Sequence, residues 1–129
     1  MRIGKLAAAS GTTAKTLRFY ENTGLLAAPG RTPGGYRHYT PDVLPRLDFI
    51  RRGRAAGLTL AQIREVLDVR DGGATPCEHV QQLLTTRLAD LDNQIADLQA
   101  LREAVAQLCD AAATVEPASC EPVAVCRYL

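Results

Sequence analysis

The sequence has no tryptophan, and only 5% of its 129 residues are aromatic. One chain can therefore build only a limited hydrophobic core, and we expect a partner chain to supply buried surface. No apolar stretch approaches the length of a membrane span, and the apolar residues that follow Met1 are too few for a signal peptide. These absences predict a cytoplasmic protein that has no membrane partner.

Histidine is also scarce, with two residues in the whole chain. No grouping of Ser, His and Asp, or of Cys and His, indicates a nucleophile with its base, and few general bases are available. We therefore expect that the protein is not an enzyme.

Charge is distributed unevenly along the chain, although the net charge is only +1. Residues 1–70 hold 12 Lys and Arg against 5 Asp and Glu, whereas residues 71–129 hold 3 against 9. A basic first half beside an acidic second half is typical of a nucleic-acid-binding domain joined to another element. The basic half has no long lysine run, which favours a folded domain over a disordered tail.

Two clusters in the basic half place arginine beside aromatic rings. Residues 18–21 (RFYE) fall in an expected helix, and residues 34–39 (GGYRHY) follow turn-forming glycine and proline. Guanidinium groups neutralise phosphates, and tyrosine hydroxyls donate to phosphate oxygens. Together the clusters predict a winged helix-turn-helix DNA-binding domain over residues 1–70.

Cap and turn residues delimit the elements around these clusters. We expect helices over residues 3–9, about 13–22, about 41–57, about 60–70 and 76 to about 109, with a short two-stranded wing inside residues 25–39. A Thr59–Gln62 capping box opens the fourth helix, and proline at position 41 begins the third. The predicted fold class is all-α, that is, mainly helical.

The last of these helices is the longest segment, since residues 77–109 contain neither glycine nor proline. Its apolar positions recur at alternating steps of three and four, with one interruption at Arg102: Leu84, Leu88, Leu91, Ile95, Leu98, Val105 and Cys109. Such a helix is roughly 50 Å long, which is more than the small domain before it can cover. We predict a dimerisation helix over residues 75–109; the alternative is a helix packed lengthwise on its own domain.

Four cysteines in a reducing cytosol favour metal ligands or sensors over structural disulfides. Cys77 lies at the start of the long helix, where unpaired N–H groups and the helix dipole favour the thiolate that binds soft metals. Cys120 and Cys126 lie in a short C-terminal tail, residues 110–129, at a spacing that lets a loop curl round one ion. An incidental or disulfide-bonded pair is the alternative for these two.

Two further residues rank below this set as metal ligands. Cys109 lies in phase with the apolar positions of the long helix, so it is either a buried, inert cysteine or a ligand at the helix end. His79 would complete a tetrahedral site, but positions two apart on a helix diverge by about 200°.

Several of these segments together resemble the MerR family of bacterial transcription regulators. The matching residues are 16–21 (TLRFYE), 24–26 (GLL), Arg31, 35–39 (GYRHY), 57–60 (GLTL) and Ile63. The resemblance implies a homodimer held by an antiparallel coiled coil and bound to double-stranded operator DNA inside a promoter. It also implies activation by distortion of the promoter DNA, so that RNA polymerase meets both promoter elements in register.

The resemblance further assigns residues that contact DNA. They are Lys15, Arg18 and Tyr20 on the second helix, Arg31, Tyr36 and Arg37 on the wing, and Arg54 at the end of the third helix. The alternative for each arginine is a solvated surface charge. For the two tyrosines the alternative is hydrophobic packing with an incidental hydroxyl.

Metal-sensing members of the family join a cysteine at the start of one subunit's dimerisation helix to cysteines in the partner's C-terminal loop. The matching residues are Cys77, Cys120 and Cys126. Copper(I) sensors of the family usually have serine at the first of these positions, so Cys77 favours a divalent ion such as zinc, cadmium, lead or mercury. Three thiolates suit mercury or lead, and a fourth ligand suits zinc or cadmium.

Two other effectors remain as alternatives within the same family. A redox-responsive iron–sulfur protein needs four clustered thiolates, whereas these cysteines are widely spaced. A regulator that responds to an organic ligand needs a larger C-terminal domain than the 20 residues of the tail. The sequence therefore predicts a metal-responsive transcriptional activator.

Overall fold

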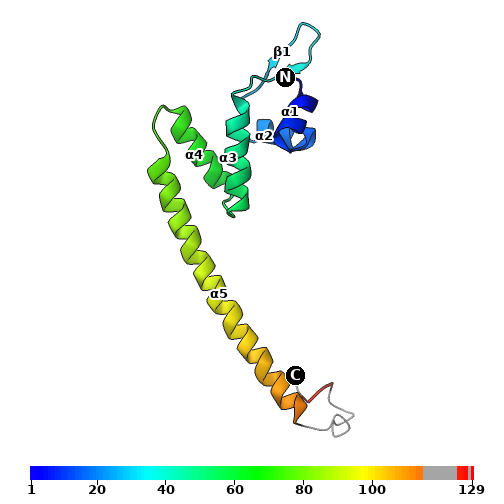
Figure 1. Cartoon of the computed structure of the whole chain (residues 1–129), viewed down its shortest axis with the longest axis vertical. Coiled ribbons are helices and arrows are strands. Elements are labelled where there is room, and N and C mark those ends of the chain that lie inside the picture. The colour runs from blue at the N-terminus through cyan, green and yellow to red at the C-terminus, as the bar shows by residue number, and fades with distance from the viewer. Residues whose placement is uncertain (115–124, 128) are drawn as a thin grey trace. The chain divides into compact units, whose positions relative to one another are not determined.

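The computed structural model describes residues 1–114, 125–127 and 129. In chain order the elements are α1 (Ile3–Ser10), α2 (Ala14–Asn22), β1 (Gly30–Arg31), β2 (Arg37–His38), α3 (Val43–Ala55), α4 (Leu60–Asp71) and α5 (Cys77–Ala113), as Figure 1 shows. The chain divides into two compact units, Met1–Thr85 and Thr86–Leu129. The mainly helical fold class is confirmed. Within the described residues, no helix is both long and apolar enough to cross a membrane.

The core of the first unit is built mainly from leucine and isoleucine. α1 contacts both α2 and α3, and α3 also contacts α4. The buried hydrophobic side chains are Leu6, Leu17, Leu25, Leu26, Tyr39, Leu47, Ile50, Leu58, Ile63, Val66 and Leu67. Tyr39 is the one aromatic residue in this set. The core is therefore formed mainly by close-packed aliphatic side chains.

The helix starts follow local capping chemistry in two places. The Thr13 hydroxyl accepts a hydrogen bond from the Thr16 N–H at 3.1 Å and begins α2. At α4, the Gln62 N–H donates to the Thr59 hydroxyl at 3.1 Å, and the Thr59 N–H donates to the Gln62 side chain at 2.9 Å. This reciprocal pair is the capping box expected from the sequence.

The start of α3 differs from the expectation. The helix begins at Val43 rather than at Pro41, and the Thr40 hydroxyl donates to the Asp42 carboxylate instead of accepting from a helix N–H. The end also comes earlier than expected, because α3 stops at Ala55, ahead of Gly57 in the left-handed region. The Thr40 hydroxyl, expected to cap the third helix, is instead bound to the carboxylate of Asp42.

One close approach between helices depends on a missing side chain. Gly53 is buried in α3, and a Cβ at this position would lie 3.0 Å from the Cδ1 and Cγ1 atoms of Ile63 on α4. Ile63 is itself fully buried. The α3–α4 contact therefore requires glycine at position 53.

The helix α5 continues through Ala113, whereas the sequence analysis ended it near residue 109. Residues 111–113 are alanines, which have the highest helix propensity, so the helix takes in the first residues assigned to the tail. No residue of α5 is buried. Its exposed large apolar side chains are Leu84, Leu88, Leu91, Ile95, Leu98, Leu101, Val105 and Leu108. The predicted apolar row thus faces solvent in the single chain.

Candidate nucleic-acid interface and cysteine positions

The helix α2 presents a basic and aromatic outer face over a buried one. Leu17 is fully buried, whereas Lys15 and Arg18 are exposed. Phe19, which belongs to the RFYE cluster but has no predicted DNA contact, is also 48% exposed, which is unusual for a phenylalanine. An exposed helix face of this composition suits contact with the phosphates and edges of a nucleic-acid groove.

The wing is an antiparallel pair in which Gly30 faces His38 and Arg31 faces Arg37. Its turn is closed by the Thr32 N–H, which donates to the Tyr36 carbonyl at 2.8 Å, and Gly35 adopts a φ of +81° that only glycine tolerates readily. This turn leaves the Tyr36 ring 56% exposed. The two-stranded wing expected within residues 25–39 is confirmed.

Glu21 joins α2 to the wing, a role that the sequence analysis did not assign. Its carboxylate accepts a hydrogen bond from the buried Tyr39 hydroxyl and forms an ion pair with the Arg37 Nε at 3.3 Å. The Glu21 side chain is only 10% exposed. A signal was present, because Glu21 is the only acidic residue among the first 41. Arg37 is thus held against α2 and is not a free surface charge.

The Tyr39 hydroxyl provides a prediction in alkaline solution. Burial, the hydrogen bond to Glu21 and the negative charge of Glu21 together raise the pKa of Tyr39 from 10.0 to about 12. The folded protein therefore keeps a proton that the unfolded chain loses, so stability present below about pH 10 is lost as the pH rises toward 12. We expect the difference in tyrosinate absorbance between wild type and Tyr39→Phe to appear near pH 12. A difference that titrates at pH 10.0, the ordinary value, would contradict this assignment.

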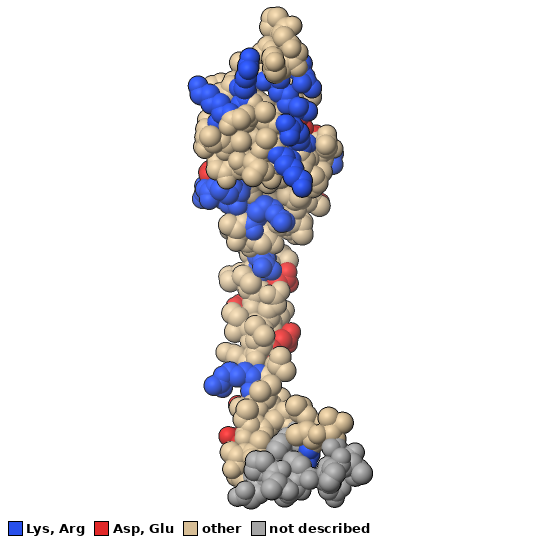
Figure 2. Space-filling view, turned by 90° about the vertical axis from the view of Figure 1, so that its right-hand side faces the viewer, with Lys and Arg blue, Asp and Glu red and all other residues tan. Residues whose placement is uncertain are grey.

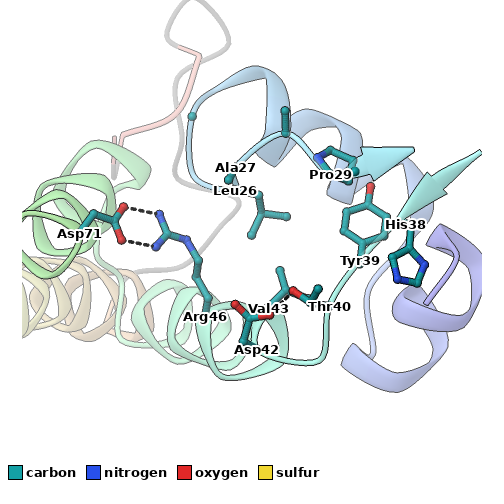
Figure 3. A pocket seen from close by; sticks show the side chains of 13 residues that line it. Leu26, Ala27, Pro29, His38, Tyr39, Thr40, Asp42, Val43, Arg46 and Asp71 are labelled. Carbon is teal, nitrogen blue, oxygen red and sulfur yellow. Dashed lines mark hydrogen bonds and ion pairs between the residues drawn. The ribbon is translucent and has the colours of Figure 1, made fainter. Parts of the chain in front are cut away.

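Arg46 connects three segments of the first unit, and Figure 3 shows its pairing with Asp71. Its Nε donates to the Leu25 carbonyl at 2.7 Å, and its two terminal nitrogens donate to the Asp71 carboxylate at 2.8 and 3.0 Å. These hydrogen bonds hold the pKa of Asp71 below its ordinary value. Because about half of the Asp71 side chain is exposed, solvent weakens the ion pair, and the arrangement matters chiefly for geometry. It fixes the segment after α2 to α3 and to the end of α4.

Six of the seven predicted DNA-contact residues fall into two groups. Arg18, Arg31, Tyr36 and Arg37 line one open cavity of about 300 Å³ between α2 and the wing. Tyr20 and Arg54 line another cavity of about 240 Å³ beside the turn between α1 and α2. Tyr20 also packs against the core, as its alternative interpretation required. Lys15 borders neither cavity.

The surface carries its positive charge where these residues lie. Figure 2 shows lysine and arginine side chains gathered over Met1–Thr85 on the visible face, and few along α5. This distribution matches the uneven charge of the sequence. A concentration of positive charge on the first unit is typical of a surface that binds nucleic acid.

The cysteines are not gathered in the described part of a single chain. Cys77 is the first residue of α5, Cys109 lies within its last two turns, and both are exposed, as is Cys126. Cys120 lies outside the described residues. Among the described residues, no group of three or more metal-binding side chains is found.

His79 is turned toward α4 and not toward a cysteine. Its Nε2 lies 3.5 Å from the Glu65 carboxylate, close enough for an ion pair if protonated, yet it makes no hydrogen bond of good geometry. The role of His79 as a metal ligand stays a prediction.

The helix pair with its wing defines a class of protein, the helix-turn-helix DNA-binding regulators. Residues 1–69 match the family model described as "MerR HTH family regulatory protein", and residues 44–108 match the one described as "MerR, DNA binding". The chain therefore belongs to the MerR family of helix-turn-helix regulators, and the resemblance seen in the sequence is confirmed.

Three similar proteins show which members of this family the chain resembles. The transcriptional regulator ZntR of Escherichia coli K12 is 38% identical over 111 residues, covering 85% of this chain and 79% of the relative. The mercuric resistance operon regulatory protein of Bacillus cereus is 35% identical, covering 83% and 81%. The crystal structure of the transcription regulator PbrR691 from Ralstonia metallidurans CH34 in complex with lead(II) is 36% identical, with a TM-score of 0.79 and coverage of 93% and 94%. All three are described as regulators, not as enzymes.

Proposed function

We propose that this protein is a dimeric transcription regulator that binds promoter DNA and responds to a thiophilic divalent ion: zinc, cadmium, lead or mercury. The observation that carries the DNA-binding part is the convergence of Arg18, Arg31, Tyr36 and Arg37 on one cavity between α2 and the wing. The metal-responsive part is supported by the relatives, one described for mercuric resistance and one in complex with lead(II).

On DNA, α2 would enter the major groove and the wing would follow the backbone. The contact residues in this arrangement are Lys15, Arg18, Tyr20, Arg31, Tyr36, Arg37 and Arg54. Because Arg37 is paired with Glu21, its charge is largely balanced, and its main role would be to orient the protein on the DNA backbone through a hydrogen bond. Activation would follow from distortion of a promoter that RNA polymerase also binds.

The homodimer would be formed by α5. Its exposed apolar row runs from Leu84 to Leu108 and leaves more apolar surface uncovered than an isolated soluble helix favours. Pairing this row with that of a second copy in an antiparallel coiled coil would bury it.

The antiparallel arrangement also suits the cysteines. Cys77 is the first residue of α5, and Cys109 stands 32 residues later in the same helix. In an antiparallel pair, Cys77 of one subunit meets the C-terminal segment of the other. The donor set proposed is Cys77, Cys120 and Cys126, with Cys109 next in rank and His79 last. A bound thiophilic ion would link the two subunits through thiolates.

The test of metal sensing is a titration of the reduced full-length protein with mercury, lead, cadmium, zinc, copper(I) and silver, followed by thiolate-to-metal absorption. We expect a divalent ion to bind tightly to the wild type and this binding to be lost in Cys77→Ser. Cys109→Ser is the matched control, because it removes one α5 thiol outside the first-ranked set. Tight binding that survives in Cys77→Ser would refute the proposed ligand set, and no tight binding by any ion would refute metal sensing.

A separate arm tests DNA binding with duplexes that the wild type selects from a randomised pool. Arg18→Ala is expected to weaken binding about tenfold or more, because one phosphate contact is lost, while metal binding stays unchanged. Equal DNA affinity in Arg18→Ala and wild type would show that Arg18 on α2 does not contact the DNA.

A further inference from the structure

A residue from outside the helix-turn-helix and the wing enters the cavity between them. Arg2 precedes α1, yet it lines the same cavity of about 300 Å³ as Arg18, Arg31 and Arg37. Three segments that are far apart in the sequence thus bring four guanidinium groups to one place. Ile3, Gly35 and Tyr36 complete the lining, and none of them is acidic.

Arg2 is held at this cavity by the Tyr36 ring. The Arg2 guanidinium carbon lies 4.4 Å from the centre of the ring, which is the geometry of a cation–π contact. The ring also lies against the turn, since a Cβ on Gly34 would come within 3.3 Å of two of its carbons. Stacking uses the face of the guanidinium and leaves the N–H groups along its edge able to donate.

The cavity has more positive charge than its surroundings neutralise. Among the described residues, one of the four arginines of the cavity forms an ion pair: Arg37, with Glu21. Arg31 donates to the Gly35 carbonyl at 3.3 Å, which satisfies an N–H but leaves its charge unbalanced. Like charges in one cavity repel, so an anion seated there lowers the energy of the site.

We propose that this cavity binds one phosphate of the DNA backbone and that Arg2, stacked on Tyr36, is a direct ligand of that phosphate. A planar guanidinium donates two parallel N–H groups to two phosphate oxygens, whereas an ammonium acts as a point charge. Tyr36 thereby acts as the support of Arg2. The inference rests on the proposed DNA-binding function and adds the N-terminal segment to its interface.

The experiment is the salt dependence of binding to the selected duplex, and to an unselected duplex of the same length, for wild type, Arg2→Ala, Arg2→Lys and Tyr36→Leu. Because each subunit of the dimer loses one phosphate contact, Arg2→Ala should reduce the magnitude of the slope of log K against log salt by about 1.8 on both duplexes. Affinity at moderate salt should fall about tenfold. Arg2→Lys should keep most of the slope but lose affinity, and Tyr36→Leu should resemble Arg2→Ala.

Arg70→Ala is the matched control, because it removes one exposed positive charge from α4, outside this cavity. If Arg2→Ala and Arg70→Ala changed slope and affinity equally, Arg2 would not be a phosphate ligand, although wild-type binding would still support DNA-binding function. If the wild type bound neither duplex, the proposed function itself would fail. If inorganic phosphate bound the wild type and not Arg2→Ala, while Arg2→Ala kept the wild-type slope and affinity for both duplexes, a free phosphate and not the DNA backbone would be the ligand.

Discussion

Replacing Gly53 with leucine is expected to destabilise the first unit by about 3 kcal/mol, because overpacking a close-packed core forces strained rotamers or backbone shifts. The Cβ alone would lie 3.0 Å from two atoms of the fully buried Ile63, and the rest of the leucine side chain has no space between α3 and α4. Urea unfolding followed by circular dichroism at a fixed protein concentration measures the loss, since the chain has no tryptophan to report it.

Gly4→Ala is the matched control for this prediction. Gly4 also lies in a helix, but no atom lies within 4 Å of the Cβ that alanine would add. Here the substitution should stabilise by about 0.5 kcal/mol through helix propensity alone. A double variant with Gly53→Ala and Ile63→Val should relieve only part of the clash, because valine lacks the Cδ1 atom but keeps a Cγ1 atom at this position. If Gly53→Leu were as stable as wild type, the close approach of α3 and α4 would be wrong.

The second large effect is expected for Glu21→Ala, at about 1–3 kcal/mol of unfolding free energy. This change removes the acceptor of the buried Tyr39 hydroxyl and the partner of Arg37 at once. An unsatisfied hydroxyl in the core and an uncompensated guanidinium both cost more than the lost hydrogen bonds themselves. The wing also loses its attachment to α2, so binding to the selected duplex should weaken in parallel.

Two further variants make the effect of Glu21 interpretable. Glu21→Gln keeps an acceptor for Tyr39 and removes only the charge, so its loss of stability should be smaller. Asp48→Ala removes a carboxylate from the exposed pair with Arg51, in which both side chains are more than half exposed, and should change stability by less than about 1 kcal/mol. Equal losses in Glu21→Ala and Asp48→Ala would show that the link between α2 and the wing contributes nothing.

The parts of this fold that the sequence predicts are those determined by neighbouring residues. The Thr59–Gln62 capping box depends on residues within about one helical turn of each other, and it is confirmed. Either Thr12 or Thr13 could cap α2 by sequence alone, and the structure has the cap at Thr13. The change of composition after Asp110 predicts an end of α5 near residue 109, which is too early. Alanines, however, continue a helix more readily than any other residue.

The contacts between distant positions were beyond sequence reasoning. Glu21 meets Tyr39, Arg46 meets Asp71 and Arg2 meets Tyr36, and no spacing rule pairs residues that far apart. For Arg37, the sequence correctly indicated a place in the wing but not the carboxylate that shares its charge.

The exposed apolar row of α5 has a consequence for the backbone. Beyond Thr85 the helix has no buried residue, so its own chain gives it little tertiary support, and isolated helices are marginal in water. The amide hydrogens of α5 beyond Thr85 would exchange with solvent at a rate set by the association of two chains, and therefore by protein concentration. Amides of α3, which pack in the core of the first unit, would exchange at a rate set by unfolding of that unit. Dilution alone would then make the far part of α5 exchange faster while leaving α3 protected.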